Sequence, residues 1–446
     1  MASTCEPVVV CDHEDAGGRL SHCRLMHEAR GIMLSDVDGG LNMRVTAVRT
    51  LRCAKFPNMV WVQVETDDGL VGLGETFRNP RSVETYIHEH AAPYLLGRDP
   101  RTVEAHWQAL SQGMETRTMG VETRALSAVD IALWDLIGKG SDRSVAECLG
   151  GPVRDAIGTY NTCAGYGYNV FRAGLAGAPV GSTWETREGE GPYEDLAAWR
   201  TNGKAGELAR SLLDSGITAM KIWPFDDYSE ATGGQYISLS DLNKAARPFH
   251  EIRDAVGMDM EIAVELHSVW SLPAALRIAE ALEPIRPLWF EDPIRMDNLK
   301  ALQEFTRSTR VPTTLSETLA TRFGFREALE AAAVDIVMLD PGWAGGISES
   351  RRIAALAETY HRPVAPHDCT GPVVYVAGVQ LCMATPNAMI QESVRAYYTG
   401  WYREVLTALP SVSAGMVHPP EGPGLGSSLR SEFLARSDVS TQESRL

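Results

Sequence analysis

The sequence predicts an α/β fold in which a (β/α)8 TIM-like barrel carries an N-terminal α+β capping domain. Three observations predict it. After Gly151, eight short apolar segments alternate with helical segments, which is typical of a parallel barrel. Between residues 43 and 150, strand-type segments precede helical ones, as in a small α+β unit. Polar residues also recur at the ends of successive barrel strands, where barrels place their active sites.

The barrel strands are short and rich in β-branched and aromatic residues. We expect them at residues 156–162, 219–223, 261–266, 287–292, 313–317, 335–340, 363–367 and 388–393. Helical runs such as 272–283 and 348–360 lie between them. Gly, Pro and acidic residues near 168–200 predict an insertion at the surface.

The capping domain begins with two strands, which we expect to be joined by a tight turn at residues 56–58, and a third strand ends near Glu75. The sequence thus divides into a peripheral N-terminal extension, the cap, the barrel and a C-terminal segment returning to the cap, at residues 1–42, 43–150, 151–394 and 395–446.

Composition excludes several classes of protein. The net charge of −17 argues against a nucleic-acid partner, because phosphate binding needs clustered Lys and Arg. No apolar run reaches the roughly 18 residues of a membrane-spanning helix, and the first residues lack the basic start of a secretory signal. The eight cysteines form no CxxC pair, which favours a reduced, cytoplasmic protein.

Three carboxylates stand at equivalent ends of successive barrel strands. Glu265, Glu291 and Glu317 are separated by 26 and 26 residues, one strand–helix unit each. Clustered negative charges repel one another, and a divalent cation resolves the conflict. Because all the donors are oxygen atoms, magnesium suits the site better than zinc.

The series continues around the predicted barrel. Asp340, His367 and Glu392 follow at intervals of 23, 27 and 25 residues, and Lys221 ends a strand on the other side. An aspartate beside a histidine orients the ring and raises its basicity, as a general base requires. A single such residue is more often a helix cap or a structural group, so the shared register carries the functional interpretation.

Several motifs together resemble the mandelate racemase branch of the enolase superfamily, over about residues 43–430. They are FEDP, DPGWAGGISE, PHDCTGP, ALSAVDIALWDLIGK and PGLG. The resemblance implies that Glu265, Glu291 and Glu317 bind Mg²⁺, that His367 and Asp340 form a catalytic dyad, and that Glu392 helps to hold a substrate carboxylate. It also implies a homo-oligomer, either a dimer or an octamer.

Two positions depart from the pattern of this branch. One is the first ligand, Glu265, where Asp is more common, and the other is Trp223. Trp223 stands where many members have a second lysine, the opposing base, which weakens a two-base mechanism; Lys221 remains available to contact the substrate carboxylate. His267 lies where dehydratases similar to galactonate dehydratase have the histidine that protonates the leaving hydroxyl; its alternative is a packing role. We also expect Trp223, Arg78 and Tyr160 to contact the substrate.

The resulting hypothesis is a metal-dependent hydro-lyase of carbohydrate catabolism. It would act on an aldonate or related sugar acid, remove the proton alpha to the carboxylate and eliminate the 3-hydroxyl, giving a 2-keto-3-deoxy acid. A racemase or epimerase acting through the same enediolate is the first alternative. A catalytically silent barrel that serves as a binding module is the second.

Overall fold

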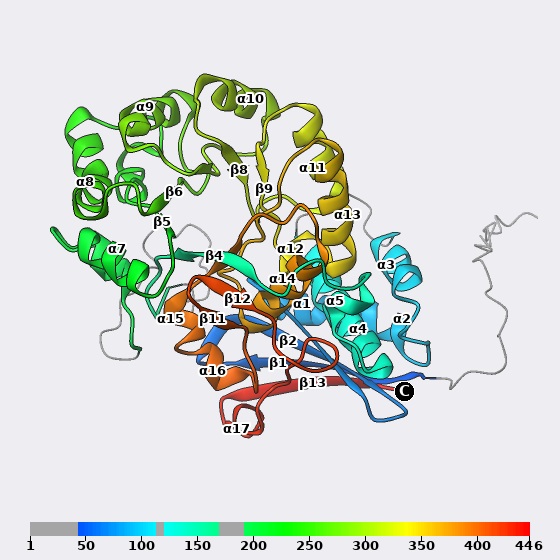
Figure 1. Ribbon diagram of the computed structural model, residues 1–446. Coiled ribbons are helices and arrows are strands. Elements are labelled where there is room, and N and C mark those ends of the chain that lie inside the picture. The colour runs from blue at the N-terminus through cyan, green and yellow to red at the C-terminus, as the bar shows by residue number, and fades with distance from the viewer. Residues whose placement is uncertain (1–42, 113–119, 169–190) are drawn as a thin grey trace, which may run out of the picture. The chain divides into compact units, whose positions relative to one another are not determined.

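The computed structural model describes residues 43–112, 120–168 and 191–446 (Figure 1). The predicted extension at residues 1–42 lies outside the described residues, as does most of the predicted insertion near 168–200.

The capping sheet is antiparallel and has the strand order β13-β1-β2-β3. Its strands are β1 (Val45–Cys53), β2 (Phe56–Thr66), β3 (Val71–Phe77) and β13 (Val439–Arg445). Valines of β1 and β2 are fully buried, which holds one face of the sheet against the helices of the cap. Because β13 comes from the C-terminal segment, that segment completes the cap, as the fold prediction stated (Figure 1).

The turn between β1 and β2 corrects the predicted turn at residues 56–58. The chain turns at Ala54 and Lys55. The backbone N–H of Ala54 donates to the carbonyl oxygen of Asp438 at 2.9 Å, and that of Lys55 donates to its carboxylate at 3.2 Å. Pro57 lies in β2 at the irregularity between the pairs Cys53–Phe56 and Leu51–Trp61, where the regular ladder is interrupted and a missing N–H is tolerated. The prediction failed because the contact that fixes the turn lies 383 residues further along the chain.

Helix α4 (Val121–Ser141) packs closely on β3 because two glycines leave room for it. A Cβ atom at Gly72 or Gly74 would collide with the carbonyl oxygens of Ala132 and Ala128 in that helix. Any larger residue would therefore push strand and helix apart. The remaining helical segments of the cap are α1 (Pro80–Tyr86), η1 (Ile87–Ala91), α2 (Ala92–Leu95), α3 (Val103–Gln112) and α5 (Val145–Cys148).

The barrel strands run parallel in the order β4 to β9, and β10 pairs back onto β4. They are β4 (Ile157–Thr162), β5 (Ala219–Ile222), β6 (Glu261–Glu265), β7 (Phe290–Glu291), β8 (Thr313–Leu315), β9 (Ile336–Val337) and β10 (Gln391–Ser393). Between β9 and β10 the strand is reduced to Val364, which bridges Val337 and Ala388. The ring therefore closes through eight positions, and the predicted fold class is confirmed.

Helices cover the outside of the ring (Figure 1). They are α7 (Ala205–Asp214), α8 (Leu239–Val256), α9 (Leu272–Leu282), α10 (Leu299–Ser308), α11 (Thr321–Glu330), α13 (Gly346–Thr359) and α14 (Pro372–Ala384). Shorter elements are α6 (Asp195–Arg200), η2 (Asp226–Tyr228), η3 (Glu230–Thr232), η4 (Glu283–Ile285), α12 (Pro341–Ala344), α15 (Arg395–Tyr398), α16 (Tyr402–Val405), β11 (Ser411–Ser413), β12 (Met416–His418) and α17 (Ser431–Leu434). Within the described part of the chain, no helix combines the length and apolar character needed to cross a bilayer.

Hydrogen bonds from the cap contact the barrel loops next to the predicted dyad. Glu75 of β3 accepts hydrogen bonds from the backbone N–H groups of Val373 and Val374, each at 3.0 Å, at the start of α14. The hydroxyl of Thr76 donates to the carbonyl oxygen of Gly342 at 2.6 Å. Since Val373 follows His367 by six residues and Gly342 follows Asp340 by two, β3 contacts the segments that come after both members of the dyad.

The Glu75 contact makes stability depend on pH in a defined direction. Burial raises the pKa of Glu75 to about 8, although the N–H groups of Val374 and Val373 oppose the shift. The neutral carboxyl thus contributes stability that is fully present below the ordinary pKa of 4.5 and is lost as the pH rises through about 8. Glu75→Gln, which is neutral at every pH, is expected to show a smaller fall in Tm between pH 6 and pH 9 than the wild type. Calorimetry measures both falls; equal falls would contradict the assignment.

Candidate active site

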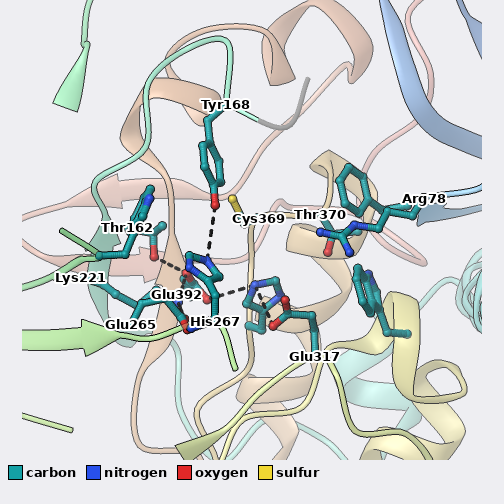
Figure 2. A pocket seen from close by; sticks show the side chains of 14 residues that line it. Arg78, Thr162, Tyr168, Lys221, Glu265, His267, Glu317, Cys369, Thr370 and Glu392 are labelled. Atoms are coloured by element: carbon teal, nitrogen blue, oxygen red, sulfur yellow. Dashed lines mark hydrogen bonds and ion pairs between the residues drawn. The ribbon is translucent and has the colours of Figure 1, made fainter. Parts of the chain in front are cut away.

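A cavity opens at the C-terminal ends of the barrel strands, and the space between its walls, mouth included, is about 500 Å³. Many of the predicted site residues line it: Arg78, Lys221, Trp223, Glu265, His267, Glu317, His367 and Glu392. Figure 2 shows Lys221, Glu265 and His267 on one side of the cavity and Arg78 with Thr370 on the other.

Tyr160 lies in the packed interior of the barrel and is not part of the cavity lining. Its ring meets that of Trp289 edge to face at 5.1 Å, in a cluster that also contains Ala219 and Ala263. Alternate residues of a barrel strand point inward in successive layers. Tyr160 is two residues before Thr162, which does line the cavity, so it occupies the layer below.

Lys221 at the end of β5 holds three carboxylates together. Its Nζ lies 2.5 Å from Oε1 of Glu291, 3.0 Å from Oε1 of Glu392 and 3.6 Å from Oε2 of Glu265. Burial acts to lower the pKa of Lys221, but Glu291 and Glu392 outweigh it and raise the pKa well above its ordinary value. The lysine therefore carries its positive charge at the floor of the cavity.

The pKa values of the three predicted metal ligands are shifted in different directions. Burial raises the pKa of Glu265 to about 8, and Lys221 offsets only part of that effect. Burial and the charge of Glu265 raise the pKa of Glu291 as well. For Glu317, burial acts in the same direction, but the positive charge of His367 and a hydrogen bond from Ser316 lower its pKa to about 2.

By donor chemistry this carboxylate cluster fits a divalent cation. All its donors are oxygen atoms from neighbouring strand ends, and the ammonium of Lys221 already lies where the carboxylates need positive charge. Among the residues that the structure describes, however, no three His, Cys, Asp or Glu side chains surround one point as metal ligands do. Glu317 instead lies 3.6 Å from Nε2 of His367. The oxygen donors of these residues therefore suit a divalent cation. In this structure, Lys221 and His367 supply the positive charge that balances the carboxylates.

His367 and Asp340 form a buried pair. Nδ1 of His367 lies 2.7 Å from Oδ2 of Asp340. The hydroxyl of Thr370 also donates to that oxygen at 2.6 Å, and the N–H of Gly342 donates to Oδ1 at 2.7 Å. Burial acts to lower the pKa of His367, but Glu317, a second nearby glutamate and Asp340 raise it well above its ordinary value. The ring is fixed with Nε2 toward the cavity.

His267 has a matching partner that the sequence analysis missed. Its Nδ1 lies 2.5 Å from Oδ2 of the buried Asp226, and its Nε2 lies 3.5 Å from the hydroxyl of Tyr168 (Figure 2). Burial acts to lower the pKa of His267, but Asp226 outweighs it and raises the pKa. Asp226 follows the end of β5 by four residues, and that acidic position after a strand end was the available signal.

Thr162 is a second missed residue. It pairs in register with Lys221 across β4 and β5, so it stands at the same level of the ring. Its hydroxyl donates to Oε1 of Glu392, while the N–H of Asp368 donates to Oε2 at 2.9 Å. Burial acts to raise the pKa of Glu392, but Lys221, His367 and these donors lower it. Glu392 is therefore an ionised acceptor, which opposes a role as hydrogen-bond donor to the substrate.

The backbone around His267 is bent to face the cavity. His267 and Ser268 have φ angles of 46° and 59°, in the left-handed region that non-glycine residues rarely adopt. The N–H of His267 donates to Oε1 of Glu265 at 2.6 Å, which holds this bend. The ring of Trp223 packs edge to face on the imidazole at 5.9 Å. Trp223 thus supports the histidine from the side.

Comparison with known proteins places both parts of the chain. Residues 40–150 match the family model of the mandelate racemase/muconate lactonizing enzyme N-terminal domain, and residues 204–433 match the enolase C-terminal domain-like model. A D-galactonate dehydratase family member of Streptomyces bingchenggensis is 30% identical, covering 88% of this chain and 92% of the relative. A D-galactonate dehydratase of Ralstonia nicotianae is 29% identical, covering 86% and 91%.

A solved structure gives the same assignment. An enolase of the mandelate racemase subgroup from Agrobacterium tumefaciens is 45% identical and superposes with a TM-score of 0.79, covering 90% of this chain and 99% of that one. Together with the two matching family models, this shows that the chain belongs to the enolase superfamily, in its mandelate racemase/muconate lactonizing enzyme branch.

Proposed function

We propose that the protein is a magnesium-dependent dehydratase of a sugar acid that yields a 2-keto-3-deoxy acid. One observation carries the proposal: two histidines, each hydrogen-bonded to a buried aspartate, face one cavity beside a lysine–carboxylate cluster. Dehydration needs a base for the alpha proton and an acid for the leaving hydroxyl, and two such pairs supply both. The relatives named as D-galactonate dehydratases support the same reaction class.

The metal is assigned from the family and from the donor set. The enolase superfamily generally uses a divalent metal. Glu265, Glu291 and Glu317 are the residues that would hold it, and their oxygen donors favour magnesium. When bound, the ion supplies a Lewis acid that stabilises negative charge on the substrate carboxylate. Lys221 donates a hydrogen bond to the same carboxylate, because its ammonium stays charged at the floor of the cavity.

His367 is assigned as the base. Its Nε2 faces the cavity while Asp340 accepts a hydrogen bond from Nδ1, which fixes the tautomer whose Nε2 is free to take a proton. Burial acts to lower the pKa of His367, and the negative charge of Glu317, one of the assigned metal ligands, is the main effect that raises it. A base must be neutral before it can accept a proton. The neutral imidazole of His367 is favoured when a group other than His367 balances the charge of Glu317.

His267 is assigned as the acid. Burial acts to lower its pKa, but Asp226 outweighs it and raises the pKa, which favours the protonated imidazole that an acid requires. The hydroxyl of Tyr168 beside Nε2 marks the side of the ring from which that proton leaves. The 3-hydroxyl of the substrate then departs as water, and the enol that remains becomes the keto acid.

A screen of sugar acids tests the proposal. Purified protein with magnesium is offered aldonic, aldaric and uronic acids, and 2-keto acid is detected with semicarbazide. With the acid so identified, His267→Asn is expected to exchange the alpha proton with solvent deuterium while forming at least 100-fold less keto acid. The exposed His250 offers a matched control, since His250→Asn is expected to behave as the wild type.

The alternatives give different results in the same screen. Deuterium in recovered, inverted substrate without keto acid would favour an epimerase in which His267 is the second base. Absence of exchange with every acid, together with absence of a magnesium-dependent thermal shift, would favour the silent barrel and overturn the proposal.

A further inference from the structure

The side of the cavity away from Lys221 carries two arginines around one tryptophan. Arg78 follows β3 with a φ angle of 67°, is exposed, and lines the cavity. Its guanidinium carbon lies 5.5 Å from the ring centre of Trp343. Arg124 of α4 approaches the same ring at 4.1 Å. We call these three residues the arginine corner.

The arginine corner lacks an anion among the described residues. Arg124 is 8% exposed and its Nε has no hydrogen-bond partner; the indole Nε1 of Trp343, itself 7% exposed, has none either. No carboxylate of the described chain lies within ion-pair distance of Arg78 or Arg124. By contrast, the buried Arg395 forms a two-pronged pair with Asp195.

Such an arrangement is costly unless an anion binds. Burial and the charge of Arg78 lower the pKa of Arg124 to about 10, and the more distant Asp340 and Glu317 offset only part of this. Stacking on an aromatic face compensates some of the charge but leaves the N–H donors unused. The corner thus brings positive potential from two guanidiniums to one side of the cavity, where Arg78 and Trp343 belong to the lining and Arg124 does not.

The position of the corner points to the far end of the substrate. Figure 2 shows Arg78 beside Thr370, across the cavity from Lys221 and Glu265, with Glu317 between the two sides. Under the proposed function, the reacting carboxylate lies at the Lys221 side and His367 reaches the adjacent carbon. The carbon chain then extends toward Arg78, so the group at its other end meets the guanidinium.

We propose that the substrate is a sugar diacid, whose second carboxylate is bound by Arg78 and stabilised by the charge of Arg124 on the same tryptophan. The inference rests on the proposed dehydratase function and narrows its substrate from sugar acids in general to dianions. A guanidinium matches the planar, two-oxygen geometry of a carboxylate. The terminal hydroxymethyl group of an aldonate carries no negative charge, so it would not balance the charge of the arginines.

The test compares acids that differ only at the far end. For each sugar configuration, kcat/KM is measured for the aldarate, the aldonate and the aldonate phosphorylated on its terminal hydroxyl. We expect the aldarate to be preferred over the matched aldonate by at least 100-fold. Arg78→Gln is expected to reduce that preference at least tenfold, mainly through KM, and Arg78→Lys to reduce it less. The side chain of Arg295 is 77% exposed, and Arg295→Gln is expected to retain the wild-type preference.

The outcomes separate this inference from the function on which it rests. If the wild type dehydrates aldonates as well as aldarates, or Arg78→Gln keeps the preference, the diacid assignment is overturned while the dehydratase stands. A preference for the phosphorylated aldonate also overturns it, in favour of a phosphate at the corner. Calorimetric binding of the aldarate to the Arg78→Gln and wild-type proteins gives a second readout, with at least tenfold weaker binding expected for the variant.

Discussion

Replacing His367 by asparagine is expected to reduce dehydration by about 10²–10⁴-fold, the usual contribution of a general base. Asparagine retains an N–H that can donate to Asp340, so the buried aspartate keeps a partner. Under the proposed function, what is lost is the nitrogen assigned to accept the alpha proton. The rate of keto-acid formation measures the loss, and solvent deuterium exchange at the alpha carbon is expected to fall with it.

Asp340→Asn is the companion variant. It removes the negative charge and replaces one of the two acceptor oxygens, which receive His367, Thr370 and Gly342, by an NH2 donor, while His367 itself stays in place. We expect a loss of activity in the same direction, with the pH dependence of the rate shifted because the imidazole no longer has its partner. The interpretation would be abandoned if His367→Asn retained activity within tenfold of the wild type while both proteins unfolded at similar temperatures.

Arg395→Met is expected to lower the free energy of unfolding by about 3–5 kcal/mol, because it leaves a buried carboxylate without its counter-charge. Nε and Nη2 of Arg395 lie 2.7 and 2.6 Å from the two oxygens of Asp195, and the amide of Asn161 donates to the same carboxylate at 2.9 Å. Burial raises the pKa of Asp195 even with Arg395 present. Urea unfolding measures the change.

Two further variants distinguish a buried pair from charge in general. Lys204 pairs with Glu207 at the surface, where both side chains are more than half exposed, so Lys204→Met is expected to cost less than about 1 kcal/mol. Replacing both partners, as Asp195→Leu with Arg395→Met, is expected to restore part of the lost stability, since no charge is then left buried alone. A single Arg395→Met variant as stable as Lys204→Met would contradict the account.

The sequence predicted which residues lie at the strand ends of the barrel better than it predicted their hydrogen-bond partners. Regular spacing between strand ends placed Lys221, Glu265 and Glu317 together because each barrel unit adds a similar length of chain. The partner of His267 could not be read in this way: Asp226 lies in a short helical turn after β5, and its approach to His267 depends on how that turn folds. The sequence also did not show how deep a side chain lies within the barrel. Tyr160 was expected to contact the substrate but lies in the layer below the cavity.

The arginine corner lay beyond sequence reasoning for a different reason. Arg78 comes from the end of a cap strand, Arg124 from a cap helix and Trp343 from a barrel loop, so their meeting requires the docking of cap on barrel. The turn at Ala54 likewise depends on a residue distant in sequence, Asp438, which directly precedes the C-terminal strand of the cap. Contacts of this kind depend on tertiary packing and leave no periodic pattern in the chain.

The pairing of β13 with β1 also constrains when the protein can fold during its own synthesis. Cys53 pairs with Val439, so the edge of β1 stays open until several hundred more residues have left the ribosome. At roughly 5–20 residues per second, that interval lasts on the order of tens of seconds. An open, apolar strand edge is a site for pairing with other chains. Nascent chains shortened before residue 439 are therefore expected to bind chaperones or aggregate, although most of the barrel is already made.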